Sequence, residues 1–184
     1  MPYRFQIHLT EQDYVNYNLF VMFRSPHGRK QYYSTLFVLV AMMALFCLYS
    51  LWSADFAPGS FVLCIPYMIA GAVFCLLLKP LMIWLLKLQV RRQKFSGKPG
   101  YSPEAVMEFF EDRFTEVTPE QKAEQKYTVI DRVCINGSRY IYIHVNTVMA
   151  YILPTSCFLS EEQREEFLHF LGERGTKISI FREK

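Results

Sequence analysis

Two uncharged apolar stretches, separated by a single aspartate, constrain this chain more than any other feature. The first covers residues 31–54 and the second covers residues 56–78, with only Asp55 between them. A helix needs about 20 apolar residues to cross a bilayer core roughly 30 Å thick. Each stretch is long enough, so the sequence predicts a transmembrane hairpin of two helices joined by a short external loop.

The basic residues predict which side of the membrane the hairpin enters from. Arg24, Arg29 and Lys30 precede the first stretch, six basic residues lie within 79–100, and the connection between the stretches has none. Lysine and arginine near the ends of spanning helices favour the cytoplasmic side. We therefore expect a multi-pass protein of the cytoplasmic membrane with both termini in the cytoplasm.

Two alternatives concern the limits of these helices. A cleaved signal peptide would need a shorter apolar core nearer the N-terminus and a small-residue cleavage site, so we expect the first helix to be retained. The second helix could instead run from Ile65 to Leu86, with Lys79 facing its partner helix. Because a charge at mid-bilayer is costly, the unshifted helix is favoured.

The remaining sequence divides by composition around the hairpin. We expect an N-terminal strand and amphipathic helix in 1–30. Transmembrane helices are expected at 31–54 and 61–90, and the second of them includes a cytosolic extension. An external loop at 55–60 joins them, in which Pro58 and Gly59 favour a turn. A basic linker at 91–100 leads to a cytosolic β-rich domain at 101–184, which has a net charge of −4. An acidic domain argues against nucleic-acid binding, which needs a basic patch on the folded surface.

Alternation and turn residues predict the elements of the soluble parts. Residues 3–9 alternate as a half-buried strand, and Thr10 caps a helix that ends at Ser25-Pro26. Strands are expected at 105–110, 113–118, 127–135, 139–145 and 148–153, with a hairpin turn at Asn136-Gly137. Ser160 and Gln163 form the capping box of a C-terminal helix, and 177–181 can add an edge strand.

Several of these segments resemble the YcxB-like family of bacterial membrane proteins. The resemblance rests on the motifs Thr10-Glu11-Gln12-Asp13-Tyr14, Tyr127-Thr128-Val129-Ile130, Tyr140-Ile141-Tyr142-Ile143, Ile152-Leu153-Pro154 with Phe158, and Ser160-Glu161-Glu162, in that order around two apolar stretches. It implies an α+β membrane protein whose small antiparallel β-rich domain is closed by a C-terminal helix, similar to pleckstrin-homology-like modules. The family implies no biochemical activity, and a fold-level analogy implies no ligand.

Chemistry-bearing residues do not form a recognisable catalytic or metal-binding pattern. The five cysteines have no Cys-x-x-Cys spacing, and the four histidines have no partner at metal-ligand spacing. The sequence also has neither a serine nucleophile elbow nor a glycine-rich phosphate loop. We therefore expect no catalytic residue, no metal and no cofactor, and we expect the cysteines of the soluble part to be free thiols.

Two groups of residues remain as candidate binding surfaces. Arg91, Arg92 and Lys94 form a basic cluster beside the membrane that could contact lipid headgroups, although such residues often only set topology. Tyr140, Tyr142 and Tyr151 alternate with core positions and could form an exposed surface for a partner. The alternative is that the terminal helix, the N-terminal strand or the bilayer covers these tyrosines.

The sequence as a whole favours a membrane-anchored, non-enzymatic interaction or regulatory module. Its expected partners are the lipid bilayer and either another protein or a second copy of the chain, with no nucleic acid. The alternatives are a lipid-binding or transport accessory protein and, with less support, a membrane enzyme.

Overall fold

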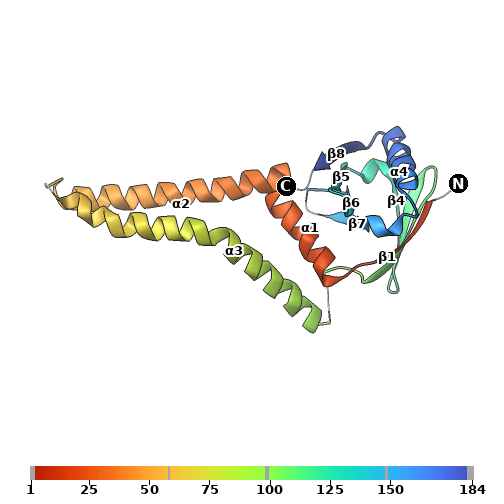
Figure 1. The fold of residues 1–184 in the computed structure, drawn as a ribbon, viewed down its shortest axis with the longest axis horizontal. Helices are drawn as coiled ribbons and strands as arrows, with labels where there is room; N and C mark the ends of the chain where they lie inside the picture. The colour runs from red at the N-terminus through yellow and green to blue at the C-terminus, as the bar shows by residue number, and fades with distance from the viewer. Residues whose placement is uncertain (1–2, 58, 98–99, 148, 182–184) are drawn as a thin grey trace. The chain divides into compact units, whose positions relative to one another are not determined.

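The chain folds into an α+β unit and a separate helical unit. The computed structural model describes residues 3–57, 59–97, 100–147 and 149–181. The α+β unit combines Met1–Val21 with Val90–Lys184, and the helical unit is Met22–Gln89 (Figure 1). One compact unit is therefore built from two segments of chain that lie on either side of the other unit in the sequence.

The helical unit consists of two long apolar helices. Helix α2 spans Pro26–Ser53, a short 3-10 helix η1 spans Ser60–Cys64, and α3 spans Ile65–Phe95. Pro26–Ser53 and Ser60–Phe95 are long and apolar enough to cross a membrane. The ring centroids of Phe46 and Tyr67 lie 6.3 Å apart, which places the two helices in contact near their connection.

The ends of these helices differ from the predicted limits for local reasons. Helix α2 begins at Pro26 rather than at residue 31, because Ser25 caps it by accepting a hydrogen bond from the Gly28 N–H (3.0 Å). Helix α3 continues to Phe95 through Pro80. In the connection between the two helices, Gly59 adopts the positive φ of +94° that suits the predicted turn. Pro58, the other predicted turn residue, lies outside the described residues.

The first sheet of the α+β unit joins residues from both ends of the chain. It has the order β1-β2-β3-β4, formed by β1 (Tyr3–His8), β2 (Glu104–Phe109), β3 (Arg113–Val117) and β4 (Lys122–Lys126). All neighbours are antiparallel, and Phe5 opposes Met107 across β1 and β2. The N-terminal strand thus lies in the same sheet as strands from the C-terminal part of the chain.

The second sheet has the order β7-β6-β5-β8. It comprises β5 (Arg132–Asn136), β6 (Tyr140–His144), β7 (Ala150–Pro154) and β8 (Lys177–Phe181). The β5–β6 hairpin turns at Gly137, whose φ of +59° suits a glycine, as the Asn136-Gly137 pair predicts. Strand β8 pairs parallel to β5, in contrast to the antiparallel neighbours elsewhere in both sheets.

One predicted strand is wrong over its first part and confirmed over residues 132–135, which lie in β5. The sequence pattern predicts a strand over 127–135, but Tyr127–Val129 form a 3-10 turn, and the strands on either side are β4 and β5. Strand β4 reads Lys-Ala-Glu-Gln-Lys and has little apolar alternation, so its sequence gives only a weak strand signal.

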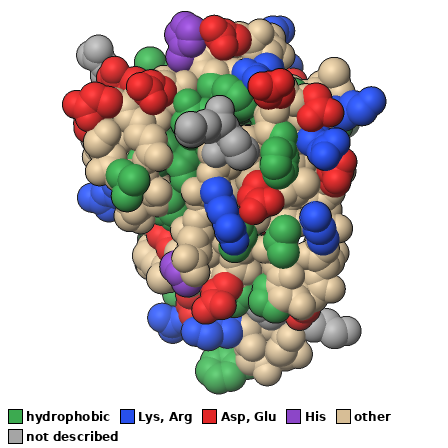
Figure 2. Space-filling model, turned by 90° about the vertical axis from the view of Figure 1, so that its right-hand side faces the viewer, with side chains coloured by type: hydrophobic (Ala, Val, Ile, Leu, Met, Phe, Trp, Pro, Cys, Tyr) green, Lys and Arg blue, Asp and Glu red, His purple; other side chains and the backbone are tan. Residues whose placement is uncertain are grey.

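The core of the α+β unit lies between the sheets and α4 (Glu161–Glu173). Phe167 and Leu171 of α4 are fully buried against inward-facing residues of both sheets, including Phe5 and Phe109. The predicted cap at Ser160 is confirmed, since the Gln163 N–H donates to Ser160 Oγ at 3.2 Å. The Gln163 side chain accepts from the Leu159 N–H at 2.8 Å instead of from the Ser160 N–H that a capping box would use. Figure 2 shows one face of the molecule, on which acidic and basic side chains are intermingled.

Helix α1 (Glu11–Phe23) covers the opposite face of the second sheet. Its Tyr17 and Phe20 pack on Tyr140, Tyr142 and other residues of a second buried cluster. The ring centroids of Phe20 and Tyr142 lie 4.9 Å apart. The second sheet is therefore buried on both faces, and all five residues of β6 are buried.

Candidate functional site

A pocket of about 830 Å³ opens in the α+β unit beside the N-terminal end of α1. Its walls come from β1, α1, the segment before β2, the inner face of β2 and β3, the turn after β3, and β7. Ligand pockets in proteins commonly have volumes of 300–1,000 Å³, so this one can hold a small organic molecule. We take it as the candidate functional site.

Two carboxylates give the pocket its charge. Glu116 lies on β3 in phase with the buried Phe114 and opposite Met107 of β2, so its side chain belongs to the inward-facing row of the sheet. Glu120 lies in the turn between β3 and β4. Among the described residues that line the pocket there is no lysine, arginine or histidine. The charged side chains among the described lining residues are therefore the two carboxylates.

Burial affects the ionisation of Glu116. It raises the pKa of this carboxyl above its ordinary value, because a half-buried carboxylate loses hydration. No salt bridge joins Glu116 to another described residue. The pKa of the Tyr151 hydroxyl is raised by burial and then by the negative charge of Glu116.

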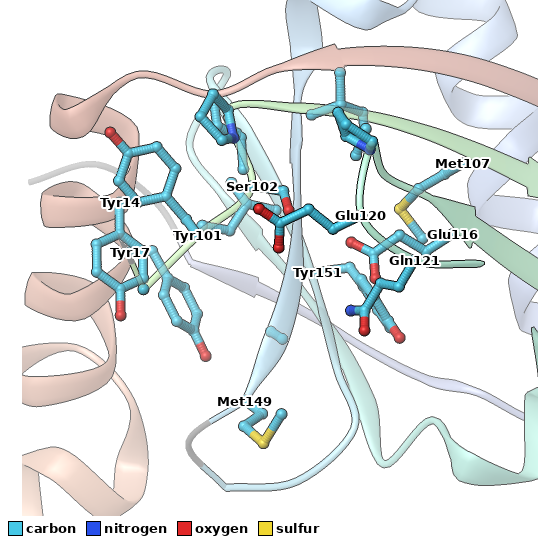
Figure 3. A pocket seen from close by; sticks show the side chains of 18 of the residues that line it. Tyr14, Tyr17, Tyr101, Ser102, Met107, Glu116, Glu120, Gln121, Met149 and Tyr151 are labelled. Carbon is cyan, nitrogen blue, oxygen red and sulfur yellow. The ribbon is translucent and has the colours of Figure 1, made fainter. Parts of the chain in front are cut away.

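Four tyrosines supply the aromatic part of the site. Tyr14 and Tyr17 come from α1, Tyr101 precedes β2, and Tyr151 lies on β7. The rings of Tyr14 and Tyr101 are stacked with their centroids 5.1 Å apart. In Figure 3 these two rings and that of Tyr17 lie on one side of the pocket, and Glu116, Glu120 and Tyr151 lie on the other.

A glycine permits the close approach of the chain to Tyr14. A Cβ atom at Gly100 would lie 2.6 Å from the hydroxyl oxygen of Tyr14, which is closer than side chains tolerate. Tyr14 itself is positioned by the first turn of α1. There Thr10 and Asp13 cap each other, with the Thr10 N–H donating to Asp13 Oδ2 at 2.8 Å and the Asp13 N–H donating to Thr10 Oγ1 at 3.3 Å.

The tyrosines predicted as a partner surface do not share one environment. Tyr140 and Tyr142 are 8% and 0% exposed beneath α1, so they do not form the predicted exposed surface. The Tyr140 hydroxyl donates to Asp13 Oδ1 at 2.6 Å and accepts from Asn16 Nδ2 at 3.1 Å, which ties α1 to β6. Tyr151 lies on a different side of the second sheet and lines the pocket.

The hydrogen bonds at Asp13 also set its ionisation. Burial acts to raise the pKa of the Asp13 carboxyl, but the hydrogen bonds from Tyr140 and Thr10 outweigh it, and the pKa is lowered. The Asp13 carboxylate thus stays ionised while it holds the start of α1 on the sheet.

The basic residues predicted to contact lipid lie in the last turns of α3. Arg91 Nε and Lys94 Nζ each lie 3.6 Å from a carboxylate oxygen of Glu11 on α1. Arg92 is exposed and makes no salt bridge with another described residue. Two of the three basic side chains thus pair with a carboxylate of α1, and all three remain exposed.

The described cysteines and histidines do not form a metal site. No group of three or more histidine, cysteine or acidic side chains among the described residues could hold a metal ion. Cys134 is buried and Cys157 is half-buried, and both are free thiols, as predicted. Burial raises the pKa of each thiol, which disfavours the reactive thiolate.

His144 is a fully buried titratable group that the sequence does not single out. It lies on β6 opposite Arg132, and its ring centroid is 6.1 Å from that of Tyr17 and 6.4 Å from that of Phe20. Burial, followed by the positive charge of Arg132, lowers the pKa of the imidazole below its ordinary value of 6.5. A backbone hydrogen bond at Asn146 and then the charge of Asp131 oppose this only in part. The folded state therefore favours neutral His144.

Acidification is expected to destabilise the α+β unit through His144. Below about pH 6.5 the unfolded chain binds a proton at this position that the folded chain does not. The free energy of unfolding then falls by up to about 1.4 kcal/mol per pH unit until the folded-state pKa is reached. Denaturant unfolding of the detergent-solubilised protein between about pH 7.5 and pH 5 measures this slope.

The substitution His144→Leu should reduce the pH dependence of the free energy of unfolding, because it removes the titratable imidazole and puts an apolar side chain in the buried position. His8→Gln is the matched control, since His8 is exposed on β1. An unchanged slope in His144→Leu would contradict the assignment.

The pocket residues Glu116, Tyr14 and Tyr101 were not identified from the sequence. For Glu116 a signal exists, because it falls two residues after Phe114 and hence on the apolar face of its strand. Tyr14 and Tyr101 meet only through the fold.

Comparison with known proteins identifies one family over part of the chain. Neither curated proteins nor solved structures yield a match to the chain. A family model described as YcxB-like protein matches residues 109–171, which contain β3 to β7 and most of α4. The resemblance of this chain to the YcxB-like family is therefore confirmed over residues 109–171, the part that includes Glu116 and Tyr151 of the pocket.

Proposed function

We propose that this protein is a membrane-anchored, non-enzymatic binding module. Helices α2 and α3 form a transmembrane hairpin, and the α+β unit lies at the cytoplasmic face, where its pocket takes a ligand or a segment of a partner. The observation that carries the proposal is the pairing of β1 with β2, on either side of the apolar helices in the sequence. If both helices cross a bilayer, this pairing requires their flanks to lie on the same side.

The exposed surface of the helices supports the membrane part of the proposal. Large apolar side chains are exposed along both helices, with Phe37 of α2 at 74% and Leu76 of α3 at 77%. Contiguous exposed apolar surface of this kind is typical of lipid-facing or partner-facing helices. Basic residues on both flanks and none in the connection favour the cytoplasmic side for the α+β unit.

The topology of the sheets supports a pleckstrin-homology-like fold for the α+β unit. A four-stranded antiparallel sheet, in which β1 comes from before the apolar helices and β2, β3 and β4 are consecutive, precedes the three-stranded meander β5-β6-β7 and helix α4. Strand β8 follows the helix. This likeness concerns the fold alone and brings no ligand with it.

Reporter fusions test the proposed topology. A green fluorescent protein fused after Lys184 should fluoresce in a bacterial host, and an alkaline phosphatase inserted at Ala57 should be active outside the cytoplasm. The exchanged fusions, phosphatase at the C-terminus and fluorescent protein at Ala57, should both be inactive. Active phosphatase at the C-terminus would contradict the proposal.

Site-specific photocrosslinking in native membranes tests the binding part. A photoreactive residue at Met149, which lines the pocket and is 66% exposed, should give a defined adduct. The matched control carries the photoreactive residue at position 180 instead, since Ile180 of β8 is 72% exposed and does not line the pocket. Identical adducts at both positions would argue against a binding role for the pocket.

A further inference from the structure

The chemistry of the pocket narrows the class of ligand that it accepts. Its lining places two carboxylates, Glu116 and Glu120, in a space of about 830 Å³, and the described lining residues include no basic side chain. An anionic ligand would be repelled by these two carboxylates. A cation would gain attraction, which is stronger where hydration is reduced.

A cationic ligand would stabilise the charged form of Glu116 in particular. It faces inward from β3 at the edge of the core, is only partly exposed, and forms no salt bridge with another described residue. A buried charge without a counter-ion is unfavourable, so a cation bound beside it would offset the cost of its burial. The other inward-facing positions nearby on the sheet, Phe114 and Met107, are apolar.

The aromatic side of the pocket distinguishes an organic cation from a metal ion. Tyr14, Tyr17, Tyr101 and Tyr151 all line it, and Tyr14 and Tyr101 are stacked on each other. Tyrosine rings attract ammonium groups through their negative faces, and cages of aromatic rings with a carboxylate suit alkylammonium ions. A metal ion would need several oxygen, nitrogen or sulfur ligands at short distances, and the described residues hold no such cluster.

We propose that this pocket binds an organic ammonium group, with the Glu116 carboxylate as its counter-ion and the Tyr151 ring, on the same side of the pocket, as its aromatic contact (Figure 3). The inference rests on the proposed binding function and names the class of ligand. The ammonium group can come from a free amine or from a lipid headgroup, and the chemistry of the pocket is the same for both.

A pair of probes of equal shape tests the charge requirement. Choline and its neutral isostere 3,3-dimethylbutan-1-ol are titrated by calorimetry into the full chain in a maltoside detergent, which carries no ammonium group. Choline should bind at least ~10-fold more tightly than the neutral isostere, consistent with a cation–π contact and a partly desolvated ion pair. Equal affinities, or no choline binding, would overturn the proposal.

An isosteric substitution assigns the effect to Glu116. Glu116→Gln should weaken choline binding by ~10-fold or more and leave binding of the neutral isostere unchanged, since only the charge is removed. Glu165→Gln, on the exposed surface of α4, is the matched control and should bind as the native chain does. Unchanged choline affinity in a Glu116→Gln protein that unfolds at the native temperature would refute the role of this carboxylate.

Nanodiscs distinguish the two sources of the ammonium group. Discs of phosphatidylglycerol with added phosphatidylethanolamine should weaken the apparent affinity for choline if the headgroup occupies the pocket, and should leave it unchanged if the ligand is a free amine. Each result supports one source. The fusion assay for topology does not depend on this ligand, so failure of choline binding and failure of membrane anchoring are separate outcomes.

Discussion

A chain that begins at residue 90 and lacks the N-terminal segment is expected not to fold. The segment contributes β1, whose Phe5 and Ile7 are 1% and 2% exposed in the core, and α1, whose Phe20 is 2% exposed over the second sheet. Burying each of these side chains contributes roughly 1.5–3 kcal/mol. Their combined loss is comparable with the whole stability of a typical domain, about 5–15 kcal/mol.

A chain that keeps β1 and α1 but lacks the helical unit also tests whether these two elements are needed for folding. Residues 3–21 joined to residues 90–184 by a flexible glycine-serine linker should form a soluble domain with cooperative thermal unfolding. The fragment 90–184 alone should show no cooperative transition by circular dichroism. Cooperative unfolding of that fragment would show that β1 and α1 are dispensable.

The substitution Phe167→Ala is expected to destabilise the α+β unit by about 3–5 kcal/mol. The Phe167 ring is fully buried on α4, and its centroid lies 4.8 Å from that of Phe109 and 5.0 Å from that of Phe5. Truncation to alanine removes these contacts and leaves a cavity between α4 and the first sheet. Because rings surround the site on several sides, it cannot close by the movement of one neighbour.

Denaturant unfolding in detergent measures the effect as a change in midpoint at constant slope. Phe95→Ala is the matched control, since Phe95 is 92% exposed at the end of α3, and it should change the stability by less than about 0.5 kcal/mol. Equal effects of the two substitutions would contradict the placement of Phe167 at the centre of the core.

Local signals in the sequence predict much of the fold. The alternation in β1 and β6, the turn at Gly137 and the N-cap at Ser160 each depend on residues close together in the chain, and each is found in the structure. Strand β4 was missed because its side chains are mostly polar. Its place is decided by pairing with β3, which no local pattern records.

The prediction that Tyr140 and Tyr142 are exposed is wrong for a different physical reason. Alternation along β6 correctly separates Ile141 and Ile143 from Tyr140 and Tyr142. The alternation does not indicate which element covers each face of the strand, and in this fold α1 covers the face that carries Tyr140 and Tyr142. A strand in a sheet enclosed on both sides has no solvent face, so an aromatic row opposite the core becomes part of a second buried cluster.

The candidate site illustrates the same limit. Glu116 stands on the apolar face of its strand and could be recognised as an inward-facing charge. The meeting of Tyr14 with Tyr101 depends on packing between α1 and the segment before β2, and these residues lie far apart in the sequence. Sites assembled from distant segments need the tertiary structure.

The pairing of β1 with β2 has a consequence for synthesis of the chain. The ribosome makes β1 and α1 first, and they must wait, with apolar side chains unpaired, until both apolar helices and then β2 have emerged. If only one of the two helices entered the bilayer, β1 and β2 would end on opposite sides and the domain could never close. In the proposed topology, a chain with the wrong number of crossings would therefore stay unfolded and open to proteolysis.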